Sequence, residues 1–125
     1  MRLPALFALS ATALLAACAG TPDPGNDPTG SWVGALVADQ GTCPTERPST
    51  LRIRGKEILF TPADGSQVLH GTYTPGNHHY HAELAMTDMN HHETAVVFNG
   101  YPVGQAIGGI FGSPSCRAHI TMTRN

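Results

Sequence analysis

Histidine is the residue type whose spacing in this 125-residue chain most readily suggests chemistry. Five of the seven histidines fall between positions 78 and 92, in the run HHYHAELAMTDMNHH, and Glu93 follows them. Imidazole nitrogens are good ligands for zinc, copper and nickel. Side chains at positions i and i+2 of a strand share a face and lie roughly 6.6 Å apart along the chain. A strand over 78–87 would therefore place His79, His81 and Glu83 on one face.

This histidine pattern leaves three interpretations open. In the first, the three residues just named form a surface site for Zn, Cu or Ni, and a second patch beyond a turn consists of His91, His92 and Glu93. In the second, histidine is simply tolerated on a solvated hairpin. In the third, protonation near pH 6 changes the surface charge of the protein. The two remaining histidines, His70 and His119, are expected to be isolated residues on other strands.

No catalytic motif accompanies the histidines. The sequence lacks a nucleophile elbow, a phosphate-binding loop, an H-E-x-x-H motif and a nucleotide-binding fingerprint. Carboxylates are few, and Asp64 and Asp88 are expected in turns. The pair Gly108-Gly109 has no helix after it that could complete a phosphate cradle, so strand packing is its expected role. We therefore expect a protein that is not an enzyme and that requires no cofactor.

The first of the three cysteines, Cys18, ends an apolar run over 3–17 that follows Arg2. The run is about 15 residues long, whereas a helix that crosses a bilayer needs roughly 20. A basic start, a short apolar region and small residues at its end are typical of an export signal. The sequence Leu-Ala-Ala-Cys that closes the run resembles the lipobox of bacterial lipoproteins.

That resemblance implies that residues 1–17 are a signal peptide and that the Cys18 sulfur receives a diacylglyceryl group. Cys18 then becomes the acylated N-terminus, and several acyl chains such as palmitate anchor it firmly. Because Ala19 replaces the Asp that retains such proteins at the inner membrane, an outer-membrane location facing the periplasm is favoured. The alternatives are an ordinary secretory signal with a chance cysteine, or an uncleaved helix.

The other two cysteines are expected to form a structural disulfide. If Cys18 carries lipid, Cys43 and Cys116 remain as a pair in an oxidising compartment. A bridge between them would enclose nearly the whole domain, and loop entropy then contributes on the order of 4 kcal/mol. A redox or metal-binding thiol pair is the alternative, but the close C-x-x-C spacing is missing.

Without residues 1–17 the chain has six Lys and Arg against nine Asp and Glu, a formal charge of −3. This charge argues against a nucleic-acid partner. Residues 18–29 contain three prolines, two glycines and two aspartates but no large apolar residue, which indicates a lipidated flexible tether that buries nothing. The domain itself is expected over 30–125.

From Gly30 onward, short alternating runs are broken by turn residues about every 8–12 positions, which is typical of an all-β sandwich or barrel. Eight strands are expected, over 32–38, 50–54, 57–61, 66–74, 78–87, 92–99, 105–112 and 116–124. Turns are expected at 39–41, 62–65, 75–77, 88–91, 101–104 and 113–115. An eight-stranded meander has two open edges unless it closes. The predicted fold is therefore all-β, a small antiparallel up-and-down barrel of about eight strands with one disulfide.

The start of the domain, Gly30-Ser31-Trp32-Val33-Gly34, resembles the first strand of lipocalin-like and avidin-like barrels. The resemblance implies that Trp32 closes one end of the barrel. Small periplasmic protease inhibitors of the lipocalin-like type share the early Trp, a disulfide and a compact eight-stranded barrel, and some of them are lipoproteins.

Together these features predict a lipid-anchored periplasmic binding or accessory module of the cell envelope. One alternative is a lipocalin-like inhibitor of a protease or another envelope-directed enzyme, and another is a transition-metal protein that uses the histidine-rich hairpin. The expected partners are the membrane, through the lipid, and either an envelope protein or a small apolar ligand. A sizeable apolar cavity would favour the small ligand, and a filled interior would favour a protein partner on the loops.

Overall fold

The computed structural model describes residues 22–125, so the signal peptide over 1–17 and the lipidation site Cys18 lie outside the described residues. The described part contains β1 (Gly30–Gly34), β2 (Val37–Gly41), β3 (Ser49–Arg54), β4 (Glu57–Thr61), the short 3-10 helix η2 (Pro62–Asp64), β5 (Leu69–Thr72), β6 (Tyr80–Thr87), β7 (Glu93–Val103), β8 (Ala106–Ser113) and β9 (Cys116–Arg124). None of the helical structure within residues 22–125 is long and apolar enough to cross a bilayer.

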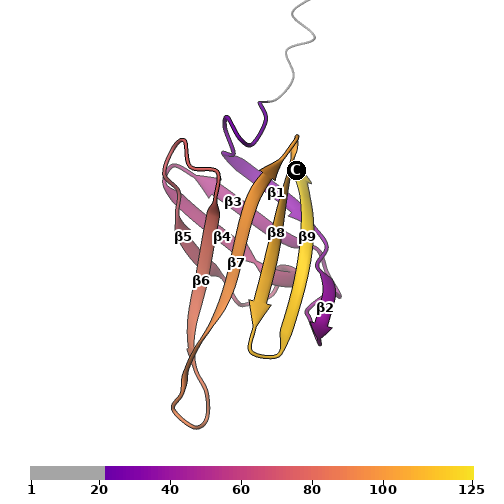
Figure 1. Ribbon diagram of the computed structural model, residues 1–125, viewed down its shortest axis with the longest axis vertical. Helices are drawn as coiled ribbons and strands as arrows, with labels where there is room; N and C mark the ends of the chain where they lie inside the picture. The colour runs from indigo at the N-terminus through magenta and orange to yellow at the C-terminus, as the bar shows by residue number, and fades with distance from the viewer. Residues whose placement is uncertain (1–21) are drawn as a thin grey trace, which may run out of the picture.

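The strands form one closed antiparallel sheet (Figure 1). Neighbours follow the order β1-β3-β4-β5-β6-β7-β8-β9-β2, and β1 also pairs with β9 through Trp32 opposite Arg124 and Val33 opposite Thr123. The strands β1 and β2 are two halves of one strand interrupted at 35–36, and both halves pair with β9. The fold is therefore a closed eight-stranded antiparallel barrel, as the sequence predicts.

The interior of the barrel is filled by side chains. The alternation along β9 buries Ala118, Ile120 and Met122 and exposes the residues between them. The rings of Phe60 and Phe98 stack with their centroids 4.2 Å apart. Each large apolar side chain that is fully buried contributes about 1.5–3 kcal/mol. Such side chains with no exposed surface include Trp32, Leu51, Ile53, Ile58, Phe60, Leu69, Tyr80, Phe98, Ile107 and Met122.

Two glycines allow the sheet to curve where strands approach closely. A Cβ at Gly34 would overlap the carbonyl oxygen of Thr121, at the point where β1 and β9 close the barrel. A Cβ at Gly71 would overlap the carbonyl oxygen of His81, where β5 meets β6 and His70 opposite Glu83 is the single paired position. Any other residue would push these strands apart, so both glycines are required for closure.

Several boundaries differ from the prediction, among them that of β5, which spans Leu69–Thr72 rather than 66–74. The expected turn at 39–41 is wrong, because these residues belong to β2 and pair with β9. The chain breaks instead at 35–36, where Leu36 enters the core with only 3% of its surface exposed. The expected turn at 101–104 is also wrong, because β7 continues to Val103 and the chain reverses at Gly104. The strand β6 begins at Tyr80 rather than at His78.

Candidate functional site

One end of the barrel is sealed by Trp32. The indole has no exposed surface, and its N–H donates a hydrogen bond to the carbonyl oxygen of Pro28 at 2.9 Å. The guanidinium carbon of Arg124 lies 4.3 Å from the centroid of the ring, so the cation covers its face. We call this end the closed end.

Arg124 also holds the segment over 22–29 against the closed end. Its two terminal nitrogens donate hydrogen bonds of 2.7–3.1 Å to the carbonyl oxygens of Thr29, Pro22 and Asp27. A guanidinium has several donors in a fixed plane and can therefore bind three carbonyl groups of one chain segment at once. Figure 1 shows this segment, in indigo, at the end of the barrel where β9 finishes.

The same segment is anchored at a second point, by Tyr80. The buried phenol donates a hydrogen bond of 2.8 Å to the carbonyl oxygen of Pro24, and burial raises the pKa of Tyr80 to about 12. Both Pro24 and Pro28 are buried. The expectation that residues up to Thr29 bury nothing is therefore wrong for 22–29, since proline rings and backbone carbonyls find partners on the barrel.

The opposite end of the barrel is open. A cavity of about 570 Å³ lies there, between the loop over 42–48 and the hairpin that joins β6 to β7. Its floor consists of Val96 and Phe111, each 2% exposed. Other side chains around it are Met86, Thr94, Pro44, Gln67 and the disulfide-bonded Cys43. We call this cavity the mouth.

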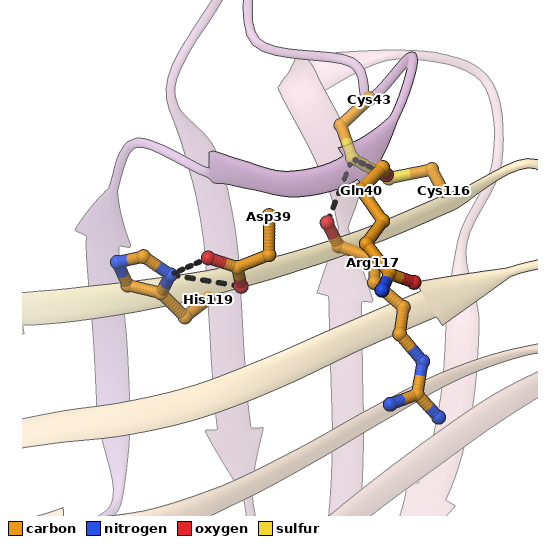
Figure 2. A network of polar contacts seen from close by, with 6 residues as sticks. All are labelled: Asp39, Gln40, Cys43, Cys116, Arg117 and His119. Carbon is orange, nitrogen blue, oxygen red and sulfur yellow. Dashed lines mark hydrogen bonds and ion pairs between the residues drawn. A yellow bond between two sulfur atoms is a disulfide. The ribbon is translucent and has the colours of Figure 1, made fainter.

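The disulfide between Cys43 and Cys116 borders the mouth and confirms the predicted pairing. It ties the loop after β2 to the first residue of β9, across 73 positions of sequence (Figure 2). The Cys43 sulfur lies 3.3 Å from the carbonyl oxygen of Arg117 and 3.7 Å from that of Gln40. A disulfide sulfur carries no proton, so these are packing contacts rather than hydrogen bonds.

The charged side chains that line the mouth are both acidic. Glu46 comes from the loop over 42–48 and Asp88 from the turn after β6. The Asp88 Oδ1 atom accepts hydrogen bonds of 2.8 Å from the backbone N–H groups of Asn90 and His92, which fixes the carboxylate. Its Oδ2 atom lies 3.5 Å from Nδ1 of His92.

Three of the predicted metal-site residues do share a face, but two of them, His79 and His81, bind an amide that the sequence interpretation missed. The Oδ1 atom of Asn99 lies 2.8 Å from Nε2 of His79 and 2.7 Å from Nδ1 of His81. An amide oxygen only accepts hydrogen bonds, so both nitrogens carry protons. The Nε2 atom of His81 lies 3.2 Å from Oε2 of Glu83. The hydrogen bond to Asn99, followed by the contact with Glu83, raises the pKa of His81.

The second predicted patch lies at the other end of the β6–β7 hairpin. His91, His92 and Glu93 follow the last residue of β6, whereas His79 precedes its first. Within residues 22–125, no group of three or more His, Cys, Asp or Glu side chains is placed to hold a metal ion. The two histidine patches are therefore separate: His79 and His81 contact Asn99, and His92 contacts Asp88.

His119 is not an isolated strand residue, contrary to expectation. Its Nδ1 atom lies 2.9 Å and 3.0 Å from the two carboxylate oxygens of Asp39 on β2 (Figure 2). The sequence interpretation placed Asp39 in a turn, so this contact could not be foreseen. The contact between Asp39 and His119 depends on the pairing of β2 with β9. No local sequence pattern encodes that pairing.

Comparisons with protein-family models, with curated proteins and with solved structures found no match to this chain.

Proposed function

We propose that this protein is a lipid-anchored binding module of the cell envelope, facing the periplasm from the outer membrane, and that it takes a small apolar ligand in the mouth of its barrel. The observation that carries this proposal is the mouth itself, a cavity of about 570 Å³ floored by Val96 and Phe111. Ligand sites are typically concave and mostly apolar, with a few polar groups at defined positions. Most of the surface that lines the mouth is apolar, and eight of its 14 lining residues are polar or charged.

The filled interior by itself favours a protein partner on the loops, so the proposal of a small ligand rests on the mouth alone, and the filled interior limits what can bind there. The stacked pair Phe60 and Phe98 fills the barrel interior behind the floor of the mouth, and Phe111, which is part of that floor, lies 6.0 Å from Phe60. A ligand therefore enters only the outer part of the barrel, and a short alkyl or aromatic group fits better than a long chain. Transition-metal binding has less support, because the histidine patches lack a third ligand within the described residues.

The anchor would set the direction in which the mouth points. Cys18 is four positions before Pro22, which Arg124 binds at the closed end, and four steps of the chain span at most about 14 Å. Lipid at Cys18 would hold the closed end near the membrane. The mouth lies at the other end of β9, a strand of nine residues, roughly 25 Å away. The ligand site would therefore face away from the bilayer.

Photolabelling of the intact lipoprotein in lipid nanodiscs tests the proposal. The probe is an octanol that carries an aliphatic diazirine, and mass spectrometry locates the labelled peptides. We expect labelling at the mouth, around Met86, Val96 and Phe111, and displacement by excess octanol. The substitution Thr94→Trp fills the mouth and should abolish this labelling, whereas Thr123→Trp, on the exposed surface near the closed end, should leave it unchanged. Labelling that octanol does not displace, or that Thr94→Trp leaves intact, would refute the proposal.

A further inference from the structure

We infer that the mouth selects apolar ligands that carry a positive charge, with alkylammonium compounds as the simplest class. This inference rests on the proposed function, because it adds a charge preference to the same cavity. The first observation is the lining. Of its 14 residues, Glu46 and Asp88 are the charged ones, and no lysine or arginine within 22–125 lines the mouth.

The two carboxylates come from different elements on either side of the apolar floor. Glu46 is exposed on the loop that the disulfide fastens to β9, and Asp88 begins the β6–β7 turn. The Asp88 carboxylate is held in place by two backbone N–H groups, so its position needs no further ordering when a ligand binds. A ligand whose apolar part rests on Val96 and Phe111 would bring its polar end to this acidic rim.

The loops at this end carry a net negative charge that comes from Glu46 and Asp88 themselves, because Asp64 and Arg47 offset each other. The connections at this end of the barrel, over 42–48, 62–68, 88–92 and 114–115, contain three carboxylates and one arginine. Arg47 belongs to this end and Arg117 lies beside it, but neither lines the mouth. His92 is the nearest titratable partner of Asp88, at 3.5 Å. The field at the rim is therefore negative and favours a cation.

The alternatives for the polar end of the ligand are less favourable. A carboxylate or phosphate would approach two carboxylates without a lining cation to offset them. A neutral hydroxyl would gain no charge attraction. Both carboxylates are exposed to solvent, so each ion pair with an ammonium is weak, and together they should improve binding about fivefold.

Three diazirine probes with the same octyl chain test this preference, with ammonium, hydroxyl and carboxylate ends. The intact lipoprotein in phosphatidylcholine nanodiscs is labelled with each at several concentrations. We expect half-maximal labelling of the mouth at about fivefold lower concentration for the ammonium probe than for the hydroxyl probe, and the weakest labelling for the carboxylate probe.

Variants separate the charge from the cavity. Glu46→Gln and Asp88→Asn should each reduce the ammonium advantage, and the double variant should remove it while leaving the hydroxyl probe unaffected. Asparagine at 88 retains an oxygen that accepts the two N–H groups, so the turn persists. Glu57→Gln, an exposed carboxylate at the closed end, is the matched control and should change nothing.

Two negative results are distinguishable. Equal labelling of the mouth by all three probes, or an ammonium advantage that survives the double variant, overturns the charge preference and leaves the proposed function intact. Failure of all three probes to label the mouth overturns both.

Discussion

The two ends of this barrel are built from the same strands, yet one is sealed and the other is open. At the closed end, Trp32 fills the interior, Arg124 covers the indole, and residues 22–29 lie over both. At the mouth, Val96 and Phe111 close the floor, and no segment within the described residues covers the space above them. At the closed end, the Trp32 side chain fills the interior and its N–H group has a hydrogen-bond partner, so this end is structural. Among the described residues, the mouth has no such side chain, so the space above its floor stays open.

Truncation of Trp32 should have the largest effect. Trp32→Ala removes a fully buried indole and leaves a cavity, so the free energy of unfolding should fall by about 3–5 kcal/mol. Met86→Ala, at the mouth, removes a side chain that is already 38% exposed and should cost less than about 1 kcal/mol. Urea denaturation measures both values. Similar losses in the two variants would contradict the distinction between the ends.

Removal of the disulfide should weaken the mouth end and the whole fold. In Cys43→Ser/Cys116→Ser, the unfolded chain regains the freedom of a 73-residue loop, which lowers the free energy of unfolding by about 2–4 kcal/mol. The loop that carries Glu46 also loses its attachment, so octyl probes should label the mouth more weakly. Addition of reductant to the wild-type protein should reproduce both effects. A denaturation midpoint of the double variant equal to that of the wild-type protein would show that the bridge does not constrain the unfolded chain.

Loss of the Arg124 side chain should release the segment over 22–29. Arg124→Ala removes three hydrogen bonds and the contact with the Trp32 ring, with an expected cost of about 2 kcal/mol. Protease cleavage within 22–29 should become faster. Arg117→Ala, on the same strand near the mouth, is the control and should change stability by less than about 0.5 kcal/mol. Equal cleavage rates in the two variants would argue against the anchoring role of Arg124.

The smallest effect concerns His81, near the start of β6. Its pKa is raised in the folded protein, mainly by Asn99, so protonation of His81 stabilises the fold. This contribution is fully present below the unfolded pKa of histidine, near 6.5, and is lost as pH rises through the higher folded value. Because the side chain is 44% exposed, the contribution is small.

Titration followed by NMR measures the pKa of His81 directly. The substitution Asn99→Ala should lower it toward the ordinary value, and Glu83→Gln should lower it less, because a glutamine oxygen still accepts a hydrogen bond from Nε2 and only the charge of Glu83, the smallest cause, is lost. Glu93→Gln, on the other side of the hairpin, should have no effect. A pKa unchanged by Asn99→Ala would show that the amide does not set the protonation of this histidine.

Local sequence pattern predicted the ends of a strand correctly where buried and exposed positions alternate strictly. The strand over 116–124 and the strand over 57–61 begin and end as predicted, because buried apolar residues recur at every second position and turn residues flank the strands. The pattern failed at 39–41 and 101–104, where Gly41 and Pro102 look like turn residues but are paired in β2 and β7.

The sequence could not fix the register between β6 and β7, the two strands that position His81 and Asn99. A four-residue turn over 88–91 would pair Thr87 with His92 and would place Phe98 opposite His81. The actual loop has five residues, with His91 at φ 64°, and Thr87 pairs with Glu93. This shift of one position brings Asn99 opposite His81, and a one-residue change in register moves every side chain to the other face.

The amino-acid sequence alone determined the number of strands, the sense of their alternation and the pairing of Cys43 with Cys116, since each depends on local periodicity or on a count of cysteines. Only the tertiary structure decided that one end is sealed and the other open, that Asn99 lies between two histidines, and that Glu46 and Asp88 border one cavity. These features join residues far apart in the chain, and their contacts exist only after closure of the barrel has set the register of every strand.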